Sequence, residues 1–363
     1  MIKNYLYILI FALSISCSQN AELDKQIGQL LMVGFRGLTV NESKTIRRDI
    51  EQYQVGSVVL FDYDVATKTP VRNVESAQQL RKLISDLQAI SKTKLIVSID
   101  QEGGKIRRLK EKFGFPKTVS AQHLGDINNY DSTYVYSLEM ASTLNQLGIN
   151  MNLAPVLDVN VNPENPIIGA LERSFSGDAM EVATHAKFFI KAHHDKNVLT
   201  ALKHFPGHGS SKSDSHLGLV DISDTWTCDE LYPYEFLIDS AYADAIMTAH
   251  VFNSKIDEND PATLSHQAIT GLLREQLHWN GVIISDDMMM GAITQHYGLK
   301  IAIEKAINAG VDMLSFANNG SEFDPDITKK AFELIHQLVD EGKISAERIK
   351  QSYQRIIKLK ERI

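Results

Sequence analysis

The sequence is poor in cysteine, has no basic cluster and has no apolar run long enough to cross a membrane, and each shortage excludes a class of protein. Its 363 residues include 2 cysteines, Cys17 and Cys228. With Cys17 in an N-terminal processing segment, the folded body keeps Cys228 alone and has no intramolecular disulfide. The formal net charge is −8, and the basic residues near the C-terminus alternate with apolar ones, as on a solvated helix face. We therefore expect no nucleic-acid partner.

The N-terminus has the layout of a secretory signal. Lys3 precedes an apolar run at 5–13, which is shorter than the roughly 20 residues of a membrane-spanning helix. Small residues then lead to Cys17, as in a bacterial lipoprotein site. We expect residues 1–17 to form a signal peptide and lipoprotein segment, with the lipid on Cys17 and the exported protein anchored to a membrane of the cell envelope. A plain cleaved signal and a buried N-terminal strand are the alternatives.

Short apolar runs rich in valine, isoleucine and leucine recur along the chain, and amphipathic stretches such as 74–90 separate them. Such runs are typical of parallel strands buried on both faces, and the stretches between them have helical spacing. This alternation predicts a single α/β domain over 22–363, a (β/α)8 TIM barrel, with a doubly wound open sheet as the alternative. The eight runs are 30–35, 57–61, 94–99, 149–154, 198–202, 245–248, 282–285 and 313–316.

Aspartates and histidines, which are suited to catalysis and substrate binding, fall at the ends of these runs, and this favours the barrel. In a barrel, the carboxyl ends of all strands meet at one mouth. The last stretch, 345–363, begins with a capping-type Ser345 and predicts a helix that closes the barrel. The residues at or just past strand ends are Asp100, Asp158, His204, His250 and Asp286.

Residues 203–216 gather three histidines, two lysines and an aspartate in a segment that its proline and glycines keep from forming a helix or strand. A metal-dependent hydrolase is one interpretation, because His204, His208, Asp214 and His216 are acceptable zinc ligands. Their spacing matches no compact zinc pattern, so we expect no metal. A structural role for His208, filling the turn between its two glycine neighbours, is equally consistent with the sequence.

The same segment reads Lys-His-Phe-Pro-Gly-His-Gly and then Asp-Ser-His, and it resembles the signature of glycoside hydrolase family 3 β-N-acetylglucosaminidases of the bacterial peptidoglycan-recycling type. Six further segments match this family in its order, namely 32–37, 100–104, 153–158, 173–176, 247–250 and 285–288. The resemblance implies a glycoside hydrolase that acts on a β-N-acetylglucosaminide saccharide without a cofactor. We expect the protein to be a monomer.

Two acids end the apolar run 282–285, and burying a carboxylate without a purpose would cost several kcal/mol. The resemblance assigns Asp286 as the nucleophile. Because successive strand residues point to opposite sides, we expect Asp287 to face away from the sugar and to cap the following helix. The alternative is that both acids only cap that helix.

The general acid and base implied by the resemblance is His216, paired with Asp214. Imidazole titrates near pH 6.5, and a neighbouring carboxylate fixes its tautomer and raises its basicity. A histidine, unlike a glutamate, does not repel an anionic acceptor, so phosphate can take the place of water. The alternative functions are therefore a β-N-acetylglucosaminide phosphorylase and, from another class, a non-catalytic sugar-binding lipoprotein.

The resemblance carries substrate binding onto Asp100, Arg108, Arg173, Lys203 and His204. For the cations in this set, salt bridges at the barrel rim are the alternative. The segment 169–173 has two more residues than the common Gly-Glu-Arg pattern, which predicts a displaced loop around Arg173. We interpret Glu102 as structural, and His193 and His194 as surface residues of a helix.

Overall fold

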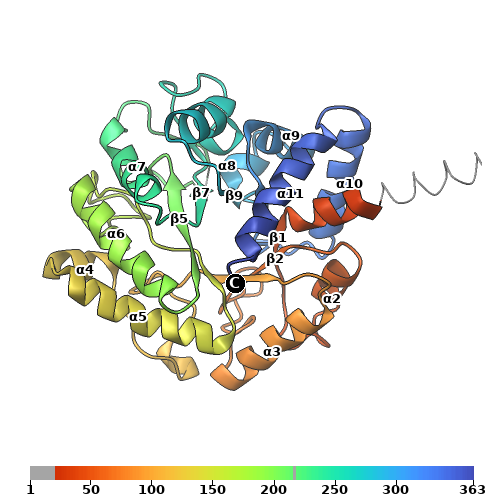
Figure 1. Ribbon diagram of the computed structural model, residues 1–363, viewed down its shortest axis with the longest axis horizontal. Coiled ribbons are helices and arrows are strands. Elements are labelled where there is room, and N and C mark those ends of the chain that lie inside the picture. Colours follow the sequence, from red (N-terminus) through yellow and green to blue (C-terminus); the bar gives the residue numbers. More distant parts are fainter. Residues whose placement is uncertain (1–20, 216–217) are drawn as a thin grey trace, which may run out of the picture.

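The computed structural model describes residues 21–215 and 218–363, so Cys17 and His216 lie outside the described residues. Eight parallel strands close into a barrel surrounded by helices (Figure 1). Each strand overlaps one of the eight apolar runs, which confirms the (β/α)8 barrel and excludes the open sheet. In barrel order the strands are β1 (Leu31–Gly34), β10 (Met313–Phe316), β9 (Val282–Asp287), β7 (Ala245–Thr248), β5 (Leu199–Phe205), β4 (Met151–Asn152), β3 (Ile96–Ile99) and β2 (Ser57–Leu60).

Some of the helices begin at a polar side chain that caps their first turn. Ser76 accepts a hydrogen bond from the backbone N–H of Gln79, and Ser345 accepts one from that of Arg348, as its capping position predicts. The helices are α2 (Lys44–Glu51), α3 (Ala77–Ile90), α4 (Ala121–Ile127), α5 (Tyr130–Leu147), α6 (Ala179–His194), α7 (Tyr232–Asp239), α8 (Gly291–Thr294), α9 (Leu299–Ala309), α10 (Ile327–Asp340), α11 (Ala346–Lys360) and a π-helix, η4 (Gln267–Gln276). Short 3-10 turns occur at η1 (Glu111–Phe113), η2 (Cys228–Leu231) and η3 (Ala262–Leu264).

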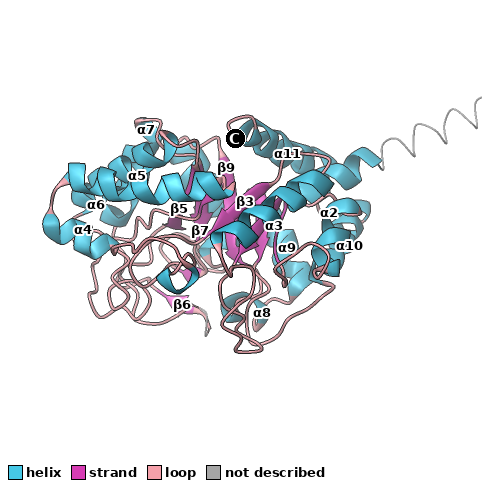
Figure 2. Cartoon of the chain, turned by 90° about the horizontal axis from the view of Figure 1, so that it is seen from below, coloured by secondary structure: helices cyan, strands magenta, loops and turns pink. Residues whose placement is uncertain are grey.

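The two ends of the barrel differ in what covers them. Figure 2 shows the C-terminus on one side and the long loops on the other, with α8 and a small outer sheet of β6 (Val220–Asp221) and β8 (Val251–Phe252) among the loops. The barrel strands themselves are almost wholly buried and form one continuous core with the inner faces of the helices. Within the described ranges, no helix is long and apolar enough to cross a membrane.

Strands β5 and β9 each carry one extra residue at the mouth. Leu202 pairs with Ile246 of β7, but the next pair joins Phe205 to Thr248, so three steps along β5 match two along β7. The same mismatch separates β9 from β10, between Ile284 and Asp287. Each mismatch is a β-bulge, which turns the side chains beyond it away from strict alternation.

The prediction that His193 is a surface residue is wrong. Its ring is completely buried on the inner face of α6, where Nε2 pairs with the Nδ2 amide of Asn152 at 3.0 Å. Burial lowers the pKa of His193 to about 4. Its neighbour His194 is partly exposed and bonds Asp244 at 2.8 Å. Helical periodicity explains the difference, since consecutive helix positions are rotated by about 100°.

A charged cluster closes the opposite end, where β10 begins. Asp312 is fully buried and accepts hydrogen bonds from Arg274 on η4 at 2.7 Å and from Arg355 on α11 at 3.2 Å. Arg348 on α11 lies 3.4 Å from the same carboxylate and also donates to the backbone carbonyls of Ile307 and Val311. Asp312 further accepts the backbone N–H of Ile283 at the start of β9. The cluster therefore fastens the C-terminal helix to the strands.

Candidate active site

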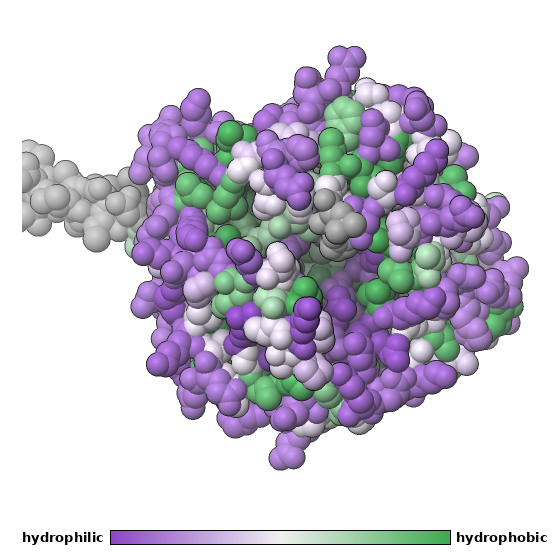
Figure 3. Space-filling view, turned by 180° about the vertical axis from the view of Figure 1, so that it is seen from behind, coloured by the Kyte–Doolittle hydropathy of each residue, from purple (hydrophilic) through white to green (hydrophobic). Residues whose placement is uncertain are grey.

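A cavity of about 490 Å³ opens at the carboxyl ends of the barrel strands, within the size range of small-ligand sites. Figure 3 shows this face of the molecule, which is hollowed near its centre. Every described residue to which the sequence assigned a catalytic or binding role lines the cavity. These residues are Asp100, Arg108, Arg173, Lys203, His204, Asp214 and Asp286.

Two cations and two carboxylates form an ion-pair cluster on one side of the cavity. The Nζ of Lys203 lies 2.7 Å from Asp100 Oδ1 and 2.7 Å from Glu102 Oε1, and Arg173 donates to both Glu102 oxygens at 2.8 and 2.7 Å. Burial alone would raise the pKa of Glu102, but Arg173 and Lys203 hold it at about 2. The pKa of Asp100 is likewise held below its usual range by Lys203 against the effect of burial. Both acids therefore remain ionised as hydrogen-bond acceptors.

Arg108 keeps donor capacity for a ligand. Its terminal nitrogen lies 3.4 Å from Asp100 Oδ2, a long contact, and among the described residues its buried Nε has no hydrogen-bond partner. A buried donor without a partner costs about 1–3 kcal/mol. The Arg108 side chain as a whole is 26% exposed and lines the cavity, where its guanidinium can meet a substrate oxygen.

His204 is held in one orientation by Asp158. Its Nδ1 lies 2.6 Å from Asp158 Oδ2, while its Nε2 lies 3.3 Å from a terminal nitrogen of Arg173. Asp158 is completely buried; burial acts to raise the pKa of its carboxyl, but the facing His204 lowers it overall. The ionised carboxylate fixes the imidazole proton on Nδ1 and turns Nε2 toward the cavity side.

The bulge in β9 brings both Asp286 and Asp287 to the cavity wall, so the expected division between two faces of the strand is wrong. Their carboxylates still differ in use. Asp287 Oδ1 accepts the backbone N–H groups of Met289 and Ala317, which ties the end of β9 to the loop after β10. Asp287 does not cap α8, because that helix begins only at Gly291 and has no side-chain cap.

His250, at the end of β7, supports the same strand end from the neighbouring side. Its Nε2 contacts the carbonyl oxygen of Asp287 at 3.0 Å, and its Nδ1 contacts Thr263 at 2.8 Å. The ring is fully buried. The peptide that carries the two acids is therefore held on both sides before any substrate binds.

Residues 203–205 belong to strand β5, so the expectation that the whole segment forms no strand is wrong for its first three residues. Described residues 206–215 form a tightly turned loop over the segment after β4. Gly207 has φ of +123°, and a Cβ at Gly209 would clash with the carbonyl oxygen of Val159, so both positions require glycine. Within the described part of the chain, no three histidine, cysteine, aspartate or glutamate side chains are placed to hold a metal ion. The rings of His204 and His208 are 6.3 Å apart, and each is engaged by its own partners.

The sequence matches the glycosyl hydrolase family 3 N-terminal domain over residues 22–359. The protein belongs to glycosyl hydrolase family 3. This confirms the family drawn from the motifs and the expectation of a glycoside hydrolase.

Relatives of this family 3 chain include the β-hexosaminidase A of Pseudoalteromonas piscicida, 32% identical over 93% of this chain and 61% of the relative. The β-hexosaminidase of Tolumonas auensis is 31% identical over 80% of this chain and 83% of its own. Among solved structures, a Paenibacillus family 3 β-N-acetylglucosaminidase superposes with a TM-score of 0.84 at 35% identity, over 93% of this chain and 62% of its own. The Beutenbergia cavernae β-N-acetylhexosaminidase has a TM-score of 0.83 at 27% identity, over 93% and 98%.

Two features of this family 3 site were not anticipated from the sequence. Asp62 lines the cavity and pairs with Lys110 at 2.6 Å; its position directly after the run 57–61 was the available signal. Leu171, in the loop that precedes Arg173, is the second, and it lines the cavity together with Ile167 and Arg173. The predicted displacement of this loop relative to the family stays a prediction.

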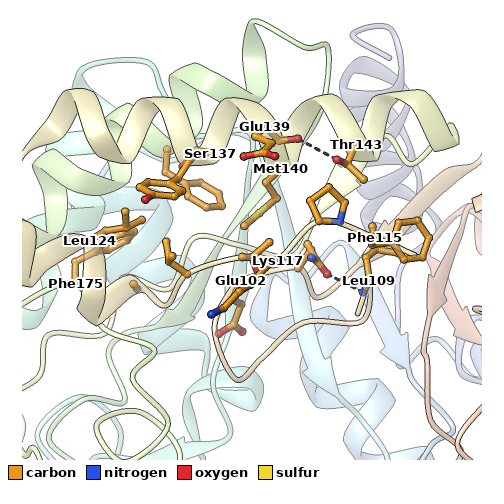
Figure 4. Close-up of a pocket in the computed structure, with 17 residues that line it drawn as sticks. Glu102, Leu109, Phe115, Lys117, Leu124, Ser137, Glu139, Met140, Thr143 and Phe175 are labelled. Atoms are coloured by element: carbon orange, nitrogen blue, oxygen red, sulfur yellow. Dashed lines mark hydrogen bonds between the residues drawn. The ribbon is translucent and has the colours of Figure 1, made fainter. Parts of the chain in front are cut away.

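A second, smaller cavity lies behind Glu102, between the loop after β3 and α5 (Figure 4). Its volume is about 30 Å³, and its walls are mainly apolar, with side chains such as Met140, Leu124 and Phe175. That volume holds one or two waters and excludes a sugar ring.

Proposed function

We propose that the protein is a retaining β-N-acetylhexosaminidase that releases terminal N-acetylglucosamine from β-N-acetylglucosaminides. The observation that carries the proposal is Asp286 in one cavity with the cluster of Asp100, Lys203 and Arg173. A carboxylate that faces a set of fixed donors and acceptors suits attack on a sugar held by its hydroxyls. The names of the relatives, β-hexosaminidase and β-N-acetylglucosaminidase, support the same class of sugar.

Ionised Asp100 accepts hydrogen bonds from two neighbouring sugar hydroxyls, as a short carboxylate can. Arg108, which is partly exposed and only loosely paired with Asp100, donates from the same wall, and Lys203 and Arg173 supply fixed positive charge to the same side. Because these groups are already paired with one another, little reorganisation is needed when the substrate binds. The ring is thereby oriented with its anomeric carbon toward β9.

Asp286 then attacks the anomeric carbon while His216 gives its proton to the departing glycosidic oxygen, and a covalent glycosyl-enzyme forms. In the second step, water gives a proton to His216 and attacks the same carbon, which releases Asp286 and N-acetylglucosamine with the original configuration. The role of His216 rests on the family motif. Asp214, its partner in that motif, lines the cavity and supports this assignment.

Peptidoglycan fragments are the substrate that we propose in the cell, with chitin-type oligosaccharides as the alternative. This follows from the proposed export signal and the lipid on Cys17, which would place the enzyme at a membrane of the cell envelope. Replacing Cys17→Ser should move the protein from the membrane fraction to the soluble fraction. Retention of the variant in the membrane would contradict the lipid anchor and leave the hydrolase proposal intact.

The function is tested by release of phenol from aryl β-N-acetylglucosaminides by the purified protein, with Asp286→Ala and His216→Ala beside it. We expect hydrolysis with retention, which NMR of the first-formed anomer detects. Product analysis with and without added phosphate distinguishes water from phosphate as acceptor, and the appearance of a sugar 1-phosphate would favour the phosphorylase. Folded protein that binds N-acetylglucosamine but cleaves no aryl glycoside would favour the non-catalytic binding protein.

A further inference from the structure

The loop that carries Asp214 is held from within by a histidine that the mechanism does not use. His208 is 1% exposed, with its ring directed under residues 211–215. Its Nδ1 lies 2.7 Å from the Ser211 hydroxyl, and its Nε2 lies 3.1 Å from the Ser215 hydroxyl. We propose that His208 is a positioning residue, whose imidazole joins both ends of this segment and so fixes Asp214 for acid and base catalysis. This inference rests on the proposed function.

The segment 211–215 is buried at its two ends, where it bonds His208, and exposed between them. Ser211 and Ser215 are buried at 0% and 1% exposure, whereas the residues at 212 and 213 between them are exposed. Asp214 is the residue directly before Ser215, so one peptide unit separates it from the bond to His208. A displacement of Ser215 therefore moves the Asp214 carboxylate along the cavity wall.

The imidazole acts in its neutral form. Burial lowers the pKa of His208 to about 4, so at neutral pH one ring nitrogen donates and the other accepts. The Nδ2 amide of Asn165 already donates to Ser211 Oγ at 2.9 Å. The Ser211 hydroxyl can then give its own proton to Nδ1, which leaves the ring proton on Nε2, directed at Ser215.

The backbone beneath the ring is itself fixed. The N–H of His208 donates to Asp158 Oδ1 at 2.8 Å, and its carbonyl accepts from Asn165 at 2.7 Å. The N–H of Gly209 donates to Glu230 at 3.1 Å. Asp158 also holds the ring of His204, so one carboxylate sets the distance between a substrate-binding residue and the loop of Asp214.

The test separates protonation of the leaving group from every other step. An aryl glycoside with dinitrophenol as leaving group departs without protonation, whereas one with phenol needs it, and kcat/KM reports only the step up to departure. We expect His208→Ala and Ser215→Ala to lower kcat/KM for the phenyl substrate by about 10- to 100-fold and to change that for the dinitrophenyl substrate by less than about threefold. His208→Gln, which keeps a donor and an acceptor, should recover part of the loss.

His185→Gln is the matched control. His185 is also a buried histidine with a lowered pKa and a hydroxyl partner, Thr133 at 2.8 Å, but it lies on α6 away from the mouth. Its replacement should lower the thermal midpoint and leave the ratio of the two substrates unchanged. Ser215→Ala decides the matter if His208→Ala fails to fold, because it removes one hydrogen bond and leaves the ring in place.

Equal losses on both substrates in the His208 and Ser215 variants, or no loss on either, would overturn the positioning role. That result is distinct from failure of the proposed function. If the wild type cleaves neither substrate, or if His216→Ala shows no dependence on the leaving group, the acid and base assignment is wrong and the inference falls with it.

Discussion

The mouth of the barrel and its opposite end both bury carboxylates among cations, and they use them differently. At the closed end, Asp312 is surrounded by three arginines, and two of these, Arg274 and Arg348, also donate to backbone carbonyls. The cluster lies where the C-terminal helix joins the strands. At the mouth, Asp100 and Glu102 also form ion pairs, both with Lys203, but these two acids line an open cavity. Buried charge alone therefore does not mark a site. A binding site is marked by charged groups whose hydrogen-bonding atoms face an open cavity.

The largest expected effect is on catalysis at the mouth. Replacing Asp286→Ala should lower kcat on aryl β-N-acetylglucosaminides by at least about 10³-fold, because it removes the nucleophile and leaves the rest of the cavity in place. The thermal midpoint should change little, since Asp286 is partly exposed. A variant that kept more than about a tenth of the wild-type kcat would place the nucleophile elsewhere.

The reverse result is expected at the closed end. Asp312→Asn leaves three partly buried arginines without their counter-charge and should lower the free energy of unfolding by about 3–5 kcal/mol, while folded protein keeps its kcat. Urea unfolding and activity in the absence of urea measure the two quantities. The exposed pair of Lys82 and Asp86 is the control, and Asp86→Asn should cost less than about 0.5 kcal/mol. Loss of kcat in folded Asp312→Asn would contradict the conclusion that the closed end serves stability and the mouth serves catalysis.

A smaller effect is expected for a cation of the mouth that keeps its charge. Arg173→Lys loses the two parallel hydrogen bonds to Glu102 and should lower kcat/KM by about 10²-fold, because an ammonium cannot reproduce the planar fork. The exposed Lys105 pairs with Glu172 next to the same loop, and Lys105→Ala should leave kcat/KM within about twofold of the wild type. Equal activity of Arg173→Lys and wild type would make this pair a rim salt bridge only.

The smallest effect concerns pH and a buried acid beneath the mouth. Burial raises the pKa of Glu230 from 4.5 to about 7, so the folded state binds this proton more tightly than the unfolded state does. Stability is therefore highest below the unfolded pKa and falls as the pH rises toward about 7. Glu230→Gln keeps an acceptor for Gly209 and removes the titration, so it should gain about 2 kcal/mol on the wild type between about pH 5 and about pH 8. Parallel unfolding curves at both pH values would contradict this assignment.

The sequence was sufficient for the barrel because parallel strands buried on both faces leave an unmistakable apolar pattern. It was also sufficient for the residues at strand ends, which the closure of the barrel brings together. It was insufficient where side-chain direction departs from simple periodicity. The extra residue in β9 turned Asp287 to the cavity wall, and the inner face of α6 buried His193. Neither a bulge nor the side of a helix that meets Asn152 can be read from one chain alone.

Contacts between distant segments were equally hidden. The partners of His208 are two serines within the same loop, but the residues that fix its backbone are Asp158 and Asn165. Glu230, which supports the next peptide, lies in a 3-10 turn with no motif around it. The loop before Arg173 likewise places Leu171 at the cavity wall, which no motif indicated.

The two bulges change how much function a strand can supply. A regular strand divides consecutive residues between the barrel interior and the helix layer, so it offers the mouth one side chain at its end. With its additional residue, β5 presents both Lys203 and His204 to the cavity, and β9 presents both Asp286 and Asp287. A substitution at the mouth thus removes one side chain from the cavity. Deletion of a single residue from β5 or β9 would restore regular alternation along that strand and change the direction of both side chains. At these two positions the spacing of residues is as much a part of the active site as their identity.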